Sequence, residues 1–352
     1  MYNDINRYVF KSFFIKMQLL FNIMMAIFSI MWKKVLKFAI EFVGIFFLVF
    51  ALYLVWREIH TLGLKQVANK ITELPLFILL IALFFIICDY TAFSGYDFLA
   101  LRYIGAKLKK WIVIKTAFIS FSVTNTTGHA YMAGGSIRYF FYSKVGLNEF
   151  QVLKMIAFES LTFLMGMGLV LDVCLILSHF LHLNHIHKYQ HLLDAGAVAI
   201  TIMFLTYLWF VVRPKRCFKW HNITIKAPTL RLTAKQMLVG SFDIISASLV
   251  FYTLFRAHMD ASYLQVAIIF LIAQVIGIAS QVPGGLGVFE AGFLYLFPHT
   301  DAEKLPLLAV LITFRALYYF LPLAASVLWL LIDSGIKFIS SNNHHQTTNN
   351  PQ

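Results

Sequence analysis

Charged residues are scarce in this sequence. Only 13% of the 352 residues are Asp, Glu, Lys or Arg, whereas 60% are hydrophobic and the mean hydropathy is +0.76. A soluble domain carries about 25% charged residues, so this composition excludes a globular protein with an ordinary water-facing surface. Several apolar runs of about 20 residues can each cross a ~30 Å hydrocarbon layer as a helix. We therefore predict an all-α, polytopic integral membrane protein.

Cysteines and acidic residues are also few. The three cysteines, Cys88, Cys174 and Cys217, form no even, spaced set, which argues against a disulfide framework and a zinc site. Only 16 acidic residues stand against 29 Lys and Arg, so the formal net charge is +13. The cations lie in short clusters between apolar runs, which is the positive-inside pattern of membrane proteins. We expect anionic lipid of the phospholipid bilayer as the partner, and no nucleic acid.

Motifs of soluble catalysts are missing. The sequence contains no nucleophile elbow, Walker loop, dinucleotide fingerprint or paired catalytic carboxylates on a soluble scaffold. One link between apolar runs is rich in histidine, with His179, His182, His185, His187 and His191. Their spacing matches no zinc motif, so a solvated link that responds to pH is expected instead. We expect no metal, no cofactor and no enzymatic activity in this chain.

The apolar runs divide the chain into about six full spans and two re-entrant helical hairpins. The spans are 38–56, 74–98, 152–180, 193–212, 237–255 and 305–332, and the hairpins are 112–150 and 263–300. Residues 31–335 form the membrane domain, and residues 336–352 a polar, disordered tail. Residues 1–30 are an uncertain extension: an extra helix, an interfacial or signal-like segment, or the product of a mis-assigned start.

Basic residues orient these segments. When the hairpins enter from opposite faces, most of the 29 Lys and Arg lie on the cytoplasmic side, and so does the C-terminus. The alternative is that residues 263–281 cross completely, which places the C-terminus outside. The favoured topology brings two glycine-rich tips near the membrane midplane, where many transporters bind substrate, and suggests an inverted repeat.

The second hairpin carries a Pro-Gly-Gly-Leu-Gly sequence. Pro283 ends the incoming helix, and Gly284, Gly285 and Gly287 allow backbone angles that are closed to other residues. A new helix can begin near Gly287, and its N-terminus would bind a phosphate or carboxylate. Glu290 follows in an apolar stretch, where an acid is costly and usually functional. A plain interfacial loop is the alternative.

The first hairpin has a similar break. Asn125 and the two threonines after it can satisfy freed backbone groups, and Gly134 with Gly135 is expected to form the tip. Ser136 is a plausible N-cap for the following helix. Arg138 then lies in the first turn, where its guanidinium could hold a lipid phosphate. The alternative is an arginine that snorkels to the interface.

Other charged residues fall inside the predicted spans. Arg315 lies in mid-span beside Tyr318 and Tyr319, and it needs an acidic partner, for which Glu290 and Glu159 are candidates. A purely structural buried pair remains an alternative.

Four aspartates also fall in or near spans. Asp89 and Asp97 bracket the end of the second span and are candidate structural or coupling acids, although Asp97 could simply face the cytoplasm. Asp172 and Asp243 also lie in spans and receive no role from the sequence.

Four motifs occur together in this order. They are Tyr-Asp-Phe with Leu-Arg-Tyr-Ile-Gly (96–105), Asn125 to Gly128 with Gly-Gly-Ser-Ile-Arg-Tyr (134–139), Val-Pro-Gly-Gly-Leu-Gly-Val-Phe-Glu (282–290) and Phe-Arg-Ala-Leu-Tyr-Tyr-Phe-Leu-Pro (314–322). Over roughly residues 31–335 the chain resembles the transmembrane domain of lysylphosphatidylglycerol synthase/flippase proteins, the MprF family with its standalone YbhN-like relatives.

The resemblance implies lipid translocation or lipid binding. In two-domain members the membrane domain moves aminoacylated phosphatidylglycerol between leaflets, while a cytoplasmic domain attaches the amino acid. This chain has no room for that synthase domain before Gln352. We expect a bacterial inner-membrane translocator whose head-group site lies between the hairpins, with Glu290 and Glu159 holding a cationic group or a coupling proton. The alternative is a non-transporting partner of anionic lipid or of a separate lipid-modifying enzyme, with homo-oligomers also conceivable.

Overall fold

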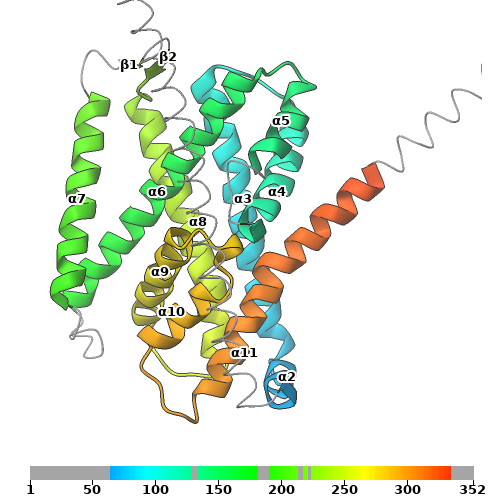
Figure 1. The fold of residues 1–352 in the computed structure, drawn as a ribbon, viewed down its shortest axis with the longest axis vertical. Coiled ribbons are helices and arrows are strands. Elements are labelled where there is room, and N and C mark those ends of the chain that lie inside the picture. The colour runs from blue at the N-terminus through cyan, green and yellow to red at the C-terminus, as the bar shows by residue number, and fades with distance from the viewer. Residues whose placement is uncertain (1–63, 128–133, 181–189, 213–216, 221–222, 334–352) are drawn as a thin grey trace, which may run out of the picture.

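The computed structural model describes residues 64–127, 134–180, 190–212, 217–220 and 223–333. The predicted span 38–56, the extension 1–30, most of the histidine-rich link and the tail 336–352 lie outside them. The helices are α2 (Leu64–Thr72), α3 (Leu76–Ile104), α4 (Lys110–Thr127), α5 (Gly135–Ser143), α6 (Glu149–Phe180), α7 (Gln190–Val212), α8 (Leu230–Arg256), α9 (Tyr263–Ala279), η3 (Pro283–Gly285), α10 (Val288–Leu296), α11 (Lys304–Phe314) and η4 (Arg315–Phe320). Figure 1 shows their arrangement.

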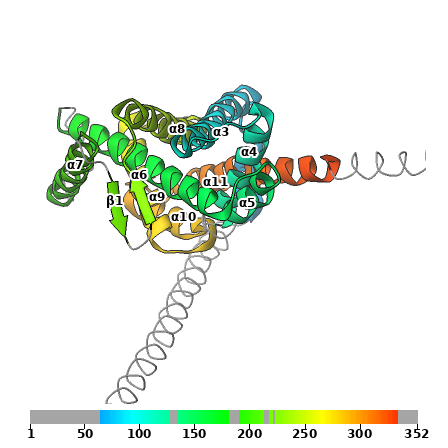
Figure 2. The ribbon, with the colours of Figure 1, turned by 90° about the horizontal axis from the view of Figure 1, so that it is seen from above.

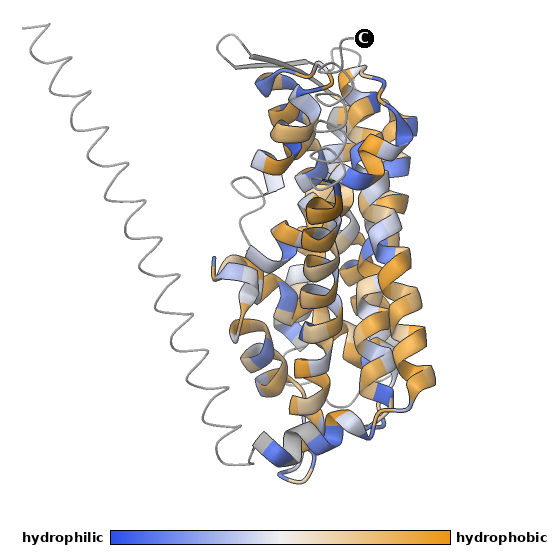
Figure 3. Cartoon of the chain, turned by 90° about the vertical axis from the view of Figure 1, so that its right-hand side faces the viewer, coloured by the Kyte–Doolittle hydropathy of each residue, from blue (hydrophilic) through white to orange (hydrophobic). Residues whose placement is uncertain are grey.

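Four helices are long and apolar enough to cross a membrane. They are α3, the first 30 residues of α6, α8, and a continuous helix Lys304–Asp333 that includes α11 and η4. Hydrophobic residues cover the middle of the long helices, and hydrophilic residues gather toward the two ends (Figure 3). The predicted span at 193–212 is α7, whose apolar part is the shorter stretch Asp194–Trp209. The predicted fold class, an all-α polytopic membrane protein, is confirmed.

The two predicted hairpins are pairs of helices that fold back on each other. In the first, Gly134 lies against Thr124 across α4 and α5. In the second, Gly292 of α10 lies against Ala273 of α9, and Gly277 lies against Phe289. Figure 1 shows α4 and α5 in the upper half of the molecule and α9 and α10 in the lower half. The order long helix, hairpin, long helix therefore occurs twice, although an inverted repeat remains a prediction.

Two local predictions are corrected. Ser136 is not the N-cap of α5, because this helix begins at Gly135 and its N-cap is Gly134. The two glycines therefore open α5, and the connection from α4 runs through residues 128–133. Residues 213–236 lie between two predicted spans, where no regular structure was predicted, but they contain an antiparallel hairpin of β1 (Cys217–Trp220) and β2 (Ile223–Lys226), followed by the first turns of α8. In β1 and β2, Cys217 pairs with Lys226.

Helices α3 and α8 form the central contact of the protein. They make the most extensive contact of any two elements described, and α7 packs on α6 at the periphery (Figure 2). Between α8, α9, α10 and α11, the core is filled by aromatic rings. The fully buried phenylalanines there are Phe251, Phe255, Phe270, Phe289, Phe293 and Phe314. This packing holds the second hairpin against two long helices.

Glycines allow α6 and α8 to cross at close range. A β-carbon on Gly166 would lie 2.2 Å from the carbonyl carbon of Gly240, and one on Gly240 would lie 2.5 Å from the Thr162 carbonyl oxygen. Small residues permit such approaches between membrane helices, where van der Waals packing drives association. Gln236 adds a hydrogen bond across the crossing by donating to the Thr162 hydroxyl at 2.9 Å.

The alanine variant of Gly240 is expected to lower stability by about 1–3 kcal/mol, because the added methyl group meets backbone that cannot move aside. Gly196→Ala in α7 is the matched control, because a β-carbon there meets nothing within 4 Å. The melting temperature of each purified variant in detergent measures the difference. Equal melting temperatures for the two variants would contradict the close crossing.

Candidate functional site

Arg315 connects the last long helix to the break in the second hairpin. Its Nε donates to Oε1 of Glu290, its Nη1 donates to the Gly284 carbonyl at 2.6 Å, and its Nη2 donates to the Gly285 carbonyl at 3.1 Å. All three nitrogens of the guanidinium are thus used within the protein. The prediction that Arg315 needs an acidic partner is confirmed, and of the two candidates the partner is Glu290, not Glu159.

The break itself depends on glycine. Pro283 begins η3 after α9 has ended, as predicted, and the next two residues, Gly284 and Gly285, both have φ of 59°. Gly287 has φ of 76° and is the N-cap of α10. These angles lie in the left-handed region that other residues rarely adopt. The carbonyl groups freed by the break then point to Arg315, which satisfies them inside the protein.

The breaks of the two hairpins meet. A β-carbon on Gly284 would lie 2.6 Å from the Thr126 carbonyl oxygen and 3.4 Å from that of Asn125, at the C-terminal end of α4. Near the same end of α4, a β-carbon on Gly134 would lie 2.0 Å from the Thr124 hydroxyl. Both helix interruptions therefore lie in one region, between the halves of the molecule. The predicted position of the two glycine pairs near the membrane midplane remains a prediction.

The N-terminus of α10 is occupied by a side chain of the same helix. Oε2 of Glu290 accepts from the Gly287 N–H at 2.7 Å, while its other oxygen accepts from Arg315. A lipid phosphate that approached this helix end would have to displace the Glu290 carboxylate. Glu290 and Arg315 are both 5% exposed, so they form a buried ion pair that stabilises the break.

A second buried cluster surrounds Arg138. Its Nε and Nη2 donate to Oδ1 of Asp97 at 3.2 and 2.9 Å, and Nη2 also lies 3.0 Å from Oε2 of Glu159. The Tyr142 hydroxyl donates to the other oxygen of Asp97. The guanidinium lies 4.6 Å from the centre of the Phe121 ring. Arg138 does not snorkel, and Asp97 does not face water, since they are 3% and 0% exposed.

This second cluster has more carboxyl groups than cations. One guanidinium faces two carboxyl groups, and Oε1 of Glu159 is buried without a hydrogen-bond partner among the described residues. A buried carboxylate oxygen without a donor is costly, and in membrane proteins such a group usually has a function. Glu159 therefore has an acceptor oxygen that the described residues leave unused.

A third cluster of buried polar side chains lies where α3, α8 and η4 meet. The Tyr318 hydroxyl of η4 donates to Asp89 at 2.7 Å, and the Tyr96 hydroxyl donates to Asp243 at 2.6 Å. Asp89 on α3 and Asp243 on α8 are both buried, on the two helices that make the most extensive contact. We predicted Asp89 as a structural or coupling acid and gave Asp243 no role. The position of Asp243 among apolar residues of a span was the signal that could have identified this residue as part of a buried polar cluster.

The remaining predicted residues are placed around these groups. Tyr319 is buried, and the Arg315 guanidinium lies 4.3 Å from the centre of its ring. Ser136 is exposed in the first turn of α5, and Asn125 is half-buried at the end of α4. The structure thus brings together most of the predicted site residues and leaves Ser136 on the surface. Lipid binding by these residues remains a prediction.

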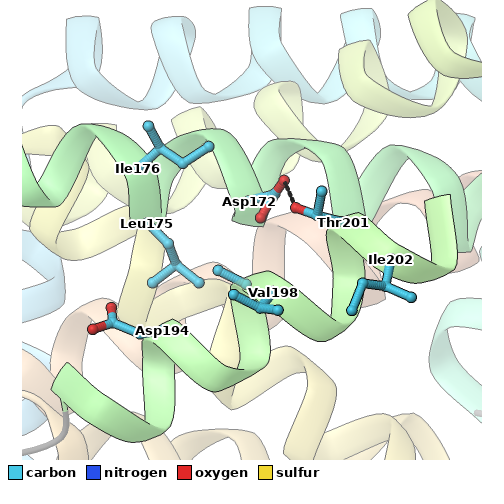
Figure 4. Close-up of a pocket in the computed structure, with 8 residues that line it drawn as sticks. Asp172, Leu175, Ile176, Asp194, Val198, Thr201 and Ile202 are labelled. Carbon is cyan, nitrogen blue, oxygen red and sulfur yellow. Dashed lines mark hydrogen bonds between the residues drawn. The ribbon is translucent and has the colours of Figure 1, made fainter. Parts of the chain in front are cut away.

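A groove lies elsewhere, between α6 and α7. Its volume is about 310 Å³, and it is lined by Asp172, Leu175, Ile176, Asp194, Ala197, Val198, Thr201 and Ile202. Figure 4 shows its mostly apolar walls, with Asp172 accepting a hydrogen bond from the Thr201 hydroxyl at 2.8 Å. None of the predicted site residues lines this groove.

Comparison with known proteins finds relatives that match most of this chain. The chain is 29% identical to the uncharacterized protein slr0712 of Synechocystis, over 85% of this chain and 92% of the relative. It is 27% identical to the inner membrane protein YbhN of Escherichia coli, over 75% of this chain and 83% of the relative. It is 24% identical to a phosphatidylglycerol lysyltransferase of Staphylococcus haemolyticus, over 88% of this chain but only 35% of that longer protein.

The family comparison covers most of the membrane region. The family described as "Lysylphosphatidylglycerol synthase TM region" matches residues 41–326, which include both hairpins and the three buried polar groups. The resemblance inferred from the four motifs is thereby confirmed. Both breaks and both buried arginines lie inside the match, and this chain belongs to the family of the lysylphosphatidylglycerol synthase transmembrane region.

Proposed function

We propose that this membrane protein is a bacterial inner-membrane lipid translocator, of flippase or scramblase type, for a phospholipid head group. The observation that carries the proposal is the meeting of two broken helices beside buried charged groups, in the part of the chain that is otherwise apolar. Broken helices and intramembrane charges mark substrate pathways in many transporters. A protein with only an anchoring role has little use for either feature.

The physical task of a translocator is to shield a polar head group. Each unsatisfied polar group in hydrocarbon costs several kcal/mol, whereas the acyl tails can stay in the lipid throughout. Arg138 can exchange one of its two carboxylate partners for a lipid phosphate, because it binds both Asp97 and Glu159. Glu159, with one oxygen unpartnered, can accept a cationic group. A head group with both charges, such as that of lysylphosphatidylglycerol, fits this pairing.

Several further aspects of the proposal rest on the relatives. A relative named as an inner membrane protein supports that location. The name phosphatidylglycerol lysyltransferase belongs to proteins that this chain covers only in part, and it supports phosphatidylglycerol or its lysyl form as substrate. We propose that this chain carries out no aminoacyl transfer, and that its C-terminus lies in the cytoplasm.

A second candidate function is that of a non-transporting partner that binds anionic lipid or regulates an envelope lipid enzyme. One observation favours it: Arg315 and the N-terminus of α10 are both occupied by groups of the protein itself. In this candidate the second hairpin is a rigid structural element, and lipid is bound without being moved.

A leaflet assay on purified protein in liposomes separates the two functions. Fluorescent phosphatidylglycerol and its lysyl form are scored by dithionite quenching or amine labelling, with protein-free liposomes as the control. A translocator should make lipid of the inner leaflet accessible at least tenfold faster than in the control. Binding of the lipids without any exchange, also when a proton gradient is applied, would refute the translocator and favour the partner.

A further inference from the structure

Asp89 and Asp243 form a pair of carboxyl groups in the centre of the protein. They lie on α3 and α8, the two helices with the most extensive mutual contact, and they are 0% and 2% exposed. Each accepts a hydrogen bond from a tyrosine hydroxyl, Asp89 from Tyr318 at 2.7 Å and Asp243 from Tyr96 at 2.6 Å. A buried carboxyl group without a nearby cation is far less costly in its neutral, protonated form than as a carboxylate.

The surroundings of the two acids supply no compensating charge. Among the described residues, no Lys, Arg or His forms an ion pair with Asp89 or Asp243. In the same part of the chain, Oδ1 of Asp89 is buried and has no hydrogen-bond partner. Two buried carboxyl groups in a low dielectric do not both stay ionised without a cation nearby, so at least one of the two carries a proton.

Each acid is connected through a tyrosine to one of the two charged clusters, the one around Arg138 or the one around Arg315. Tyr96, which donates to Asp243, directly precedes Asp97, the partner of Arg138. On the other side, Tyr318 donates to Asp89 and lies one helical turn after Arg315. Tyr318 belongs to the π-helical segment η4, and such segments often occur at functional sites.

Through these two tyrosines, the binding of a lipid head group at Arg138 or Arg315 can change the protonation of Asp89 and Asp243. A hydrogen bond donated to a carboxylate stabilises its charged form, so loss of the donor favours the protonated form. A head group that draws Arg138 away from Asp97, or Arg315 away from Glu290, would move the neighbouring Tyr96 or Tyr318. The other ionisable groups facing the pair and its two tyrosines are Cys88, Tyr90, Glu159 and Tyr319.

We propose that Asp89 and Asp243 are a proton-binding pair that releases and rebinds one proton as the lipid pathway changes state, so that lipid movement is coupled to a proton gradient. The proton comes from water on one side of the membrane and leaves to water on the other, and no bond other than O–H is made or broken. The coupling rests on the proposed translocation of lipid, whereas the proton-binding pair itself does not.

Infrared spectroscopy of the full chain in liposomes tests the proton-binding pair directly. At neutral pH the wild type should show the carbonyl stretch of a protonated carboxylic acid, with a shift in D₂O. The difference spectrum between wild type and the double variant Asp89→Asn/Asp243→Asn should contain this band. Asparagine keeps the size of the side chain and its hydrogen bonds but cannot release a proton. Asp172→Asn, at the α6–α7 groove, is the control that should leave the band in place.

The leaflet assay tests the coupling. With one proton moved per lipid, a pH difference across the membrane should shift the final ratio of labelled lipid between leaflets about tenfold per pH unit. In the double variant the ratio should not respond to the gradient, while Asp172→Asn should respond like the wild type.

Each outcome decides one part of the proposal. A spectrum without the acid band in the wild type, or with the same band in the double variant, overturns the proton-binding pair. Lipid exchange that ignores the gradient in the wild type overturns the coupling and leaves the translocator intact. The complete absence of lipid exchange refutes the translocator and the coupling together, and the infrared result still decides whether the pair binds a proton.

Discussion

Replacing Arg315 with methionine is expected to destabilise the protein by about 3–5 kcal/mol. The substitution leaves the Glu290 carboxylate buried without its cation, and it removes the donors to the Gly284 and Gly285 carbonyls. Methionine preserves most of the side-chain volume, so the loss reflects the polar contacts and not an empty space. Because these contacts hold the break in place, we also expect the second hairpin to open to proteases or to hydrogen exchange.

Unfolding of the purified protein in detergent, followed by melting temperature and denaturant midpoint, measures this effect. Asp260→Asn is the control, because it breaks the exposed ion pair with Arg256, and such pairs contribute at most about 1 kcal/mol. The double variant Glu290→Gln/Arg315→Met should be more stable than Arg315→Met alone, because it no longer buries an unpaired charge. Equal loss of stability for Arg315→Met and Asp260→Asn would show that the buried pair does not stabilise the break.

In the cluster around Arg138, Glu159→Gln is expected to separate function from stability. Stability should change by less than about 1 kcal/mol, since glutamine still accepts from Arg138 and Arg138 keeps Asp97 as its ionic partner. Exchange of a lipid with a cationic head group should fall about tenfold to a hundredfold, which corresponds to one lost charge-assisted hydrogen bond of 1.5–3 kcal/mol. Exchange of phosphatidylglycerol, which has no cation, should fall much less.

Asp97→Asn is the matched comparison in the same cluster. Asp97 accepts two hydrogen bonds from Arg138 and one from Tyr142, so its neutralisation weakens all three and should cost about 3 kcal/mol or more. Melting temperatures and leaflet assays on both variants, with lysylphosphatidylglycerol and phosphatidylglycerol, provide the measurement. If Glu159→Gln lost as much stability as Asp97→Asn, or slowed both lipids equally, Glu159 would be a structural residue and not the site of the cation.

The spans and the breaks could be predicted because both depend on local properties. The low content of charge and the long apolar runs determine that helices cross a membrane, since only hydrogen-bonded helices satisfy the backbone there. Pro283 and its glycines determine that α9 ends and α10 begins, since their backbone angles are set within a few residues. Boundaries were less accurate, and both the hairpin of β1 and β2 and the start of α5 were missed.

The partners of the buried charges could be decided only by the tertiary structure. The sequence allowed either Glu290 or Glu159 for Arg315, and it did not connect Asp97 with Arg138, which lies 41 positions away. Nor did it place Tyr96 on Asp243 or Tyr318 on Asp89, across 147 and 229 positions. Pairing depends on which faces of the helices meet, and those faces are selected by close packing, such as the crossing at Gly166 and Gly240. The sequence alone therefore determined that polar groups lie in the membrane, whereas helix packing decided which of them form ion pairs and hydrogen bonds with one another.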